Sequence, residues 1–84
     1  MNNYQLSTLK LIFSKPPPKG LEWSRIESLL VSLGALVVEG RGSRVRFELK
    51  GEVATFHRPH PDKHAKHYQI RDARRFLELA GVTP

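Results

Sequence analysis

Apolar residues recur at helical spacing in three parts of the chain. The first part covers about residues 4–14 and stops at the Pro16–Pro18 run, which cannot continue a helix. The second covers residues 23–33, with apolar side chains at an interval of three or four. The third begins at about residue 68 or 69 and continues to residue 80. We therefore predict three helices, each of which presents an apolar face.

Between the second and third of these helices, the pattern changes to that of strands. Residues 36–39 form a short apolar run, and residues 44–49 then alternate strictly between polar and apolar. A period of two indicates a strand with one buried and one exposed face. Lys50-Gly51 has the composition of a two-residue turn, and residues 52–57 form the returning strand. The sequence therefore predicts a β-hairpin preceded by one more strand.

The order of elements, α-β-β-β-α after a short extra N-terminal helix, predicts an α+β fold. A three-stranded antiparallel sheet with helices on one face buries the apolar stripes most simply. A length of 84 residues indicates one domain, 1–84. We divide it into an N-terminal extension with a proline-rich spacer, residues 1–19, and a core, residues 20–84.

The two-residue turn also fixes which side chains share a face of the hairpin. Residues opposite each other on paired strands point to the same side, so Arg44 faces His57 and Arg46 faces Thr55. The apolar set of this hairpin, Phe56 included, then points to the other side, toward the helices. We expect Arg44, Arg46 and His57 to lie together on the open face of the sheet.

The net charge of the chain indicates which classes of molecule it could bind. The net charge is +6, and residues 41–84 hold ten basic and five acidic side chains, a net of +5. A basic domain with clustered arginines is typical of polyanion binders, although a merely solubilising surface is the alternative. The absence of cysteine excludes disulfides and cysteine nucleophiles. No apolar run reaches the roughly 20 residues that cross a bilayer, so we expect a cytoplasmic protein without membrane contact.

The four histidines fall within residues 57–67, and their spacing permits a zinc site as one interpretation. Prolines on both sides of His60 keep that segment extended, so we do not expect His57 and His60 to share one face of a helix. Only Asp62 offers a further ligand nearby. We therefore expect no metal and no cofactor.

The same histidines and the neighbouring cations are suited to phosphodiester chemistry on RNA. Imidazole exchanges a proton near neutral pH, and arginine or lysine binds phosphate and stabilises added negative charge. RNA supplies its own 2′-hydroxyl nucleophile, so this reaction requires no metal. His57 and His60 are the candidate catalytic residues. The candidate RNA-binding residues are nearby basic side chains and one turn hydroxyl: Arg41, Ser43, Arg44, Arg46, Arg58 and Lys63.

The turn at residues 40–43 has two interpretations. Its glycines would let the backbone approach a phosphate closely, and Ser43 would add a hydroxyl group. It is followed by a strand and lacks the lysine of a Walker-type loop, so a simple tight turn is the alternative.

Taken in order, these segments resemble the HicA family, the toxins of HicA–HicB toxin–antitoxin pairs. The resemblance extends from about Leu21 to Val82. It rests on five short matches, at residues 21–30, 33–35, 42–47, 58–61 and 75–82. It implies a fold similar to that of double-stranded-RNA-binding domains, cleavage of mRNA as an mRNA interferase, and neutralisation by a HicB antitoxin.

One position departs from the family pattern. The family's usual motif is Gly-Ser-His with a catalytic histidine, whereas this chain has Gly42-Ser43-Arg44. Arginine stays protonated and is a poor general base. Our hypothesis is that His57, opposite Arg44, acts as the base, with His60 as its partner or as a phosphate contact. The alternative is a non-catalytic RNA-binding module that has kept the fold.

Overall fold

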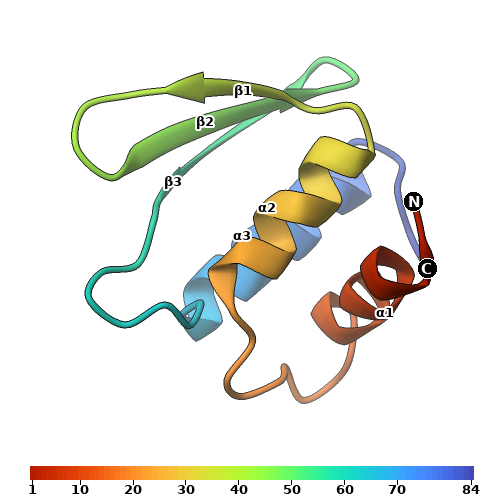
Figure 1. Ribbon diagram of the computed structural model, residues 1–84. Helices are drawn as coiled ribbons and strands as arrows, with labels where there is room; N and C mark the ends of the chain where they lie inside the picture. The colour runs from red at the N-terminus through yellow and green to blue at the C-terminus, as the bar shows by residue number, and fades with distance from the viewer.

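The computed structural model describes residues 1–84 and has three helices and one three-stranded antiparallel sheet (Figure 1). The helices are α1 (Asn3–Ile12), α2 (Trp23–Ser32) and α3 (His67–Leu79). The strands are β1 (Leu36–Glu39), β2 (Arg44–Leu49) and β3 (Glu52–His57), in the spatial order β1-β2-β3. This arrangement confirms the predicted α+β fold, α-β-β-β-α with an extra N-terminal helix. None of the helices is long and apolar enough to cross a membrane.

The β2–β3 hairpin has the predicted two-residue turn. Lys50 and Gly51 have φ values of 50° and 80°, and a turn of type I′ needs positive φ at both positions. Leu49 therefore pairs with Glu52, and at the other end of the ladder Arg44 pairs with His57. β1 completes the sheet on the other side of β2, with Val38 opposite Arg46. The register predicted from alternation and turn length is confirmed.

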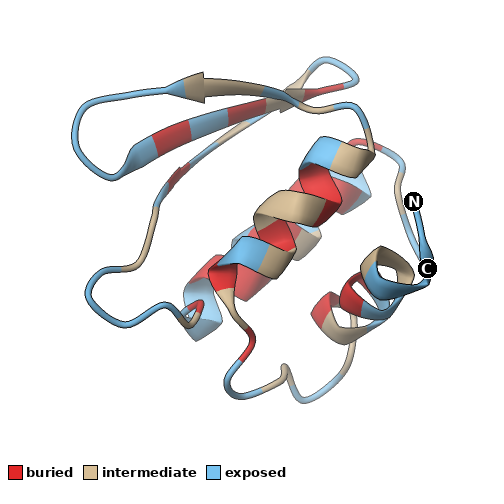
Figure 2. Cartoon of the chain, in the orientation of Figure 1, coloured by how far each residue is buried: buried red, intermediate tan, exposed pale blue.

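The sheet, the helix pair α2 and α3, and α1 are stacked in that order (Figure 1). Along β2 the side chains alternate between buried and exposed, as the red and pale blue bands of Figure 2 show. Trp23 begins α2 and is buried against Phe56, with ring centroids 5.1 Å apart. Phe47 lies 6.0 Å from Phe56 and 6.4 Å from Trp23, which gives the core an aromatic centre. Trp23 is thus a core residue rather than a stacking platform for bases.

The N-terminal helix is an integral part of this core. Asn2 and Gln5 form a reciprocal capping box that satisfies two backbone donors at the start of α1. Leu9 and Ile12 are fully buried and belong to the same hydrophobic cluster as α2 and α3. Arg25 of α2 lies over the Tyr4 ring, 4.4 Å from its centre. Residues 1–19 therefore supply buried side chains to the core.

The loop between β3 and α3 is attached to the start of α2. The Trp23 amide donates to the Lys63 carbonyl at 3.0 Å, and the Ala65 amide donates to the Leu21 carbonyl at 2.8 Å. Buried Gln69 donates from Nε2 to the His57 carbonyl at 2.7 Å, which fixes the end of β3 against α3. The helix begins at His67, slightly before the predicted residue 68 or 69.

Candidate nucleic-acid interface

The face of the sheet that no helix covers carries three rows of side chains. From the hairpin end, the rows are Leu36–Glu48–Val53, Val38–Arg46–Thr55 and Arg44–His57. The two outer members of the first row are apolar and more than half exposed. Arg46 pairs with Glu48 at 3.0 Å, so the positive charge of this face is concentrated toward the far end of the hairpin.

Arg44, Arg46 and His57 line one hollow on this face, which also borders Glu39 and Gly40. All three side chains are exposed, which confirms their predicted placement on the open side of the sheet. The Arg44 stem crosses Gly40 so closely that a Cβ at Gly40 would lie 3.1–3.2 Å from the Cβ, Cγ and Cδ atoms of Arg44. A glycine at this position therefore makes room for the arginine side chain.

His60 lies in a second hollow, with Gly42, Ser43, Arg58 and Pro59. The two candidate catalytic histidines thus both lie near the turn at residues 40–43, but they line different hollows. The Arg58 amide donates to the Ser43 carbonyl at 2.9 Å, which joins the turn to the loop that carries His60. Ser43 and His60 are therefore brought together, whereas His57 is grouped with Arg44.

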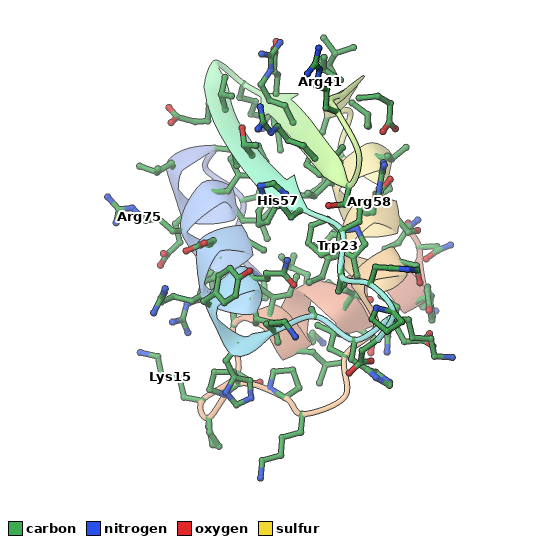
Figure 3. All side chains as sticks on the ribbon, turned by 90° about the vertical axis from the view of Figure 1, so that its left-hand side faces the viewer. Lys15, Trp23, Arg41, His57, Arg58 and Arg75 are labelled. Carbon is green, nitrogen blue, oxygen red and sulfur yellow. The ribbon has the colours of Figure 1, made fainter.

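Arg41 and Lys63 differ in their surroundings. Arg41 is exposed, forms no ion pair and points away from the body of the molecule (Figure 3). Lys63 Nζ lies 2.9 Å from the Glu22 carboxylate on the molecular surface. This contact raises the pKa of Lys63 and lowers the pKa of Glu22. Of the two, only Arg41 presents a cation without a carboxylate partner.

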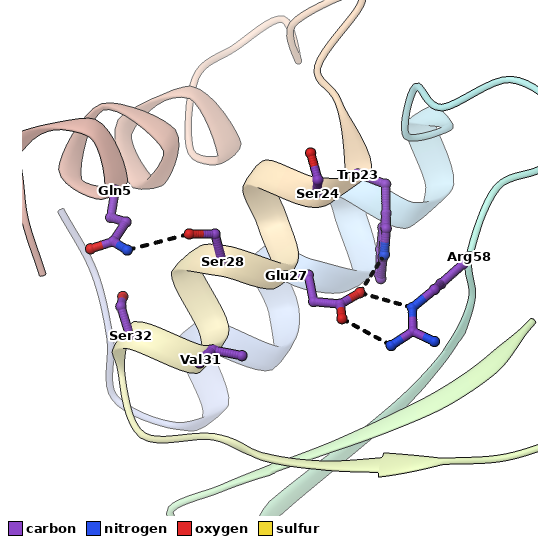
Figure 4. Close-up of a pocket in the computed structure, with 8 residues that line it drawn as sticks. All are labelled: Gln5, Trp23, Ser24, Glu27, Ser28, Val31, Ser32 and Arg58. Carbon is purple, nitrogen blue, oxygen red and sulfur yellow. Dashed lines mark hydrogen bonds and ion pairs between the residues drawn. The ribbon is translucent and has the colours of Figure 1, made fainter.

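Arg58 is engaged by two carboxylates. Its Nε and Nη2 donate to the two oxygens of Glu27 at 3.0 and 2.9 Å (Figure 4). Its Nη1 and Nη2 donate to the two oxygens of Glu39 at 2.6 and 2.9 Å. The hydrogen bonds from Arg58 lower the pKa of both carboxyl groups and raise the pKa of the guanidinium itself. Arg58 is therefore the centre of an ion-pair network rather than an open cation.

Sequence reasoning did not identify Glu27 and Glu39 as part of the site. Glu27 lies on the polar side of α2, and Glu39 is the last residue of β1. The Trp23 indole also donates to Glu27, from Nε1 to Oε1 at 2.8 Å, so one oxygen of this carboxylate has two donors. No motif connects these residues, and only the fold brings them together.

The histidine-rich segment does not gather into a ligand cluster. His64 pairs with Asp62, Nδ1 to Oδ1, at 2.7 Å, and its amide donates to the same oxygen at 3.0 Å. These contacts, led by the backbone hydrogen bond, lower the pKa of Asp62. Nowhere do three or more side chains of the types that bind metals lie close enough together to hold an ion.

Comparison with known proteins gives one match. The model of a family described as "HicA toxin of bacterial toxin-antitoxin" matches residues 23–82, which is 60 of the 84 residues. The match begins at α2 and ends just after α3, so α1 lies outside it. No curated protein and no solved structure matches the chain significantly.

Proposed function

Because the chain belongs to the HicA toxin family of bacterial toxin–antitoxin systems, we propose that this toxin is a cytoplasmic mRNA endonuclease of a type II pair. It cleaves RNA without a metal ion, and a HicB-like antitoxin neutralises it. The observation that carries the proposal is the group Arg44, Arg46 and His57 on the open face of the sheet.

The charge and shape of this face are suited to a ribose-phosphate strand. Two guanidinium groups lie on neighbouring rows of one strand, and planar guanidinium binds two phosphate oxygens at once. Arg41 and Ser43, in the turn at residues 40–43, add a further cation and a hydroxyl group next to Arg44. A strand that crosses Arg44 and Arg46 therefore passes beside the His57 imidazole.

The reaction that these groups support is internal transesterification. Neutral His57 takes the proton of the 2′-hydroxyl, and the 2′-oxygen forms a bond to the adjacent phosphorus. The bond from phosphorus to the 5′-oxygen breaks, and a general acid protonates that departing oxygen. The products are a 2′,3′-cyclic phosphate and a 5′-hydroxyl end. His60 is either that acid or a phosphate contact, and Arg44 stabilises the charge that develops on the phosphoryl oxygens.

A second candidate function rests on Arg44 itself. Arginine is present where the family's usual motif has a catalytic histidine, and it stays protonated at any physiological pH. A chain that has kept the fold and lost the base would bind RNA through the same arginines without cleaving it. Only the endonuclease forms cleavage products. In both cases RNA binding becomes weaker as the salt concentration rises.

Cleavage of a defined RNA by the purified protein in EDTA distinguishes these functions. We expect cyclic-phosphate or 3′-phosphate ends, loss of cleavage at a 2′-deoxy position, and loss of activity in His57→Ala. His60→Ala is tested in parallel, and the exposed His67→Ala is the control. Full activity in both His57→Ala and His60→Ala contradicts the assignment of these histidines. Binding without cleavage by the wild type favours the non-catalytic module.

The antitoxin is tested in cells. Induced expression is expected to arrest growth, and co-expression of the product of the adjacent small gene is expected to restore it. Growth arrest that no neighbouring gene product relieves contradicts the toxin–antitoxin part of the proposal.

A further inference from the structure

The network around Arg58 connects the parts of the molecule that border both hollows. We propose that Glu27 and Glu39 act through Arg58 as positioning residues that hold the turn at residues 40–43 and the histidine-bearing loop in one fixed arrangement. The inference rests on the proposed RNA-cleaving function of that face.

Arg58 is attached to both ends of the turn. Its guanidinium holds Glu39, the residue directly before the turn, and its backbone amide holds the Ser43 carbonyl at the other end. Gly40 and Arg44 close the turn with a further backbone hydrogen bond of 2.9 Å. The position of Arg44 on the open face thus depends on Arg58, which lies in the loop between β3 and α3.

Glu27 connects this assembly to the helices. Arg58 binds both of its oxygens, and the Trp23 indole donates to one of them. Trp23 packs in turn on Phe56, the residue before His57. The His57 carbonyl is held separately by Gln69 of α3. His57, the last residue of β3, and Arg58, the first residue of the loop, are therefore attached to two different helices. This attachment restricts the freedom of the segment that leads to His60.

The same contacts argue against Arg58 as a phosphate ligand. All three of its guanidinium nitrogens donate to carboxylates, and the side chain is only 31% exposed. The cluster of Glu27, Glu39 and Arg58 has a net charge of −1. A phosphate that approached it would have to displace a bidentate carboxylate and would meet two negative charges. This geometry favours an internal role for Arg58.

The decisive variant is Glu39→Gln, because Glu39 is mostly exposed and its replacement leaves the core intact. Its charge-matched control is Glu78→Gln, an exposed residue of α3 without an ion pair. Both changes remove one negative charge, but Glu39 lines the hollow of Arg44, Arg46 and His57 and Glu78 does not. The rate at saturating RNA is therefore the readout that compares the two variants. For both variants and for Arg58→Lys, we measure the rate at saturating RNA and the RNA affinity. We also measure amide hydrogen exchange of residues 41–44, of residue 58 and of His60.

We expect Glu39→Gln to lower kcat about 10- to 100-fold relative to Glu78→Gln. Arg58→Lys keeps the positive charge and is expected to lower kcat to a similar extent relative to the wild type. Amide exchange in the two segments becomes faster. Combining the two substitutions is expected to add little to either one, because both break the same network.

Two results would overturn the proposal. If Glu39→Gln increases RNA affinity while amide exchange stays unchanged, and the increase disappears when Arg58→Lys is added, the carboxylate had been masking Arg58 as a phosphate ligand. If kcat and exchange both match the control, the network positions nothing. If the wild-type protein binds RNA without cleaving it, the proposed function is contradicted, but the positioning role is not. In that case amide exchange in the two segments is the test: faster exchange in the variants supports the positioning role, and unchanged exchange contradicts it.

Discussion

Arg44 and His57 are direct partners across the β2–β3 ladder, and both side chains extend from the face of the sheet that no helix covers. Directly opposed residues of antiparallel strands have Cβ atoms about 4.5–5.5 Å apart. The Arg44 guanidinium therefore extends from the sheet beside the His57 imidazole. Under the proposed function, this pairing would bring the proton acceptor and the phosphate-binding group to the same nucleotide.

Removing either arginine of the open face is expected to weaken RNA binding in a salt-dependent way. Each neutralised phosphate contact adds about 0.7 to the slope of log K against log salt for a single strand. Arg44→Gln and Arg46→Gln should each lower the slope by about that amount. Fluorescence anisotropy across a salt series measures it, with Lys15→Gln, in the proline-rich segment, as the control. Equal slopes for all three variants and the wild type contradict RNA binding at this face.

Gly40→Ala is expected to displace the Arg44 side chain. The new Cβ would meet the Arg44 stem at 3.1–3.2 Å, which is closer than ordinary van der Waals contact. We expect a roughly two- to tenfold loss of RNA affinity, equivalent to about 0.4–1.4 kcal/mol. The same binding assay checks this result.

The double variant Gly40→Ala/Arg44→Gln tests the cause of that loss. If Gly40 acts only by making room for the arginine, the double variant binds RNA as weakly as Arg44→Gln alone. An additional loss in the double variant shows that the new Cβ, which also meets the Cβ, Cγ and Cδ positions that glutamine keeps, disturbs more than the arginine side chain.

The Glu27–Arg58 contact is expected to stabilise the protein at neutral pH and to fail in acid. Hydrogen bonding to Arg58 lowers the pKa of Glu27 below its ordinary value of 4.5. The folded state therefore binds the proton less readily than the unfolded state. The contribution is complete above about pH 4.5 and is lost as the pH falls through the lower, folded-state pKa.

Thermal unfolding followed by circular dichroism between pH 7 and pH 3 tests this dependence. The melting temperature of the wild type should fall more steeply below pH 4.5 than that of Glu27→Gln. At pH 7 the variant should be the less stable of the two. Parallel curves for the two proteins would show that the contact does not contribute to stability.

The buried side of α1 is expected to be essential for stability. Leu9 is only 1% exposed, and its truncation leaves a cavity between α1 and the other helices. Leu9→Ala should lower the free energy of unfolding by about 2–5 kcal/mol. Leu79→Ala, at an exposed position, should change it by no more than about 0.5 kcal/mol. Urea denaturation measures both, and similar values for the two variants contradict a core role for α1.

The sequence alone was sufficient to predict the helices and strands, the register of the β2–β3 hairpin and the side chains of its open face. Alternation along residues 44–49 fixes which side chains are buried, and a two-residue turn fixes which residues oppose each other. Both are local properties of the chain, so the pairing of Arg44 with His57 follows without knowledge of the rest of the fold. Helical periodicity likewise located the helices to within a few residues.

The surroundings of Arg58 were decided by the tertiary structure. Sequence reasoning grouped Arg58 with the RNA-binding cations, but Glu27 and Glu39, which are 31 and 19 residues away, occupy its guanidinium. Two further features could be seen only in the tertiary structure. One is the burial of α1 against the other helices, and the other is that His57 and His60 line separate hollows. Ion pairs and hollows depend on the distance between elements remote in sequence, and neither residue type nor spacing encodes that distance.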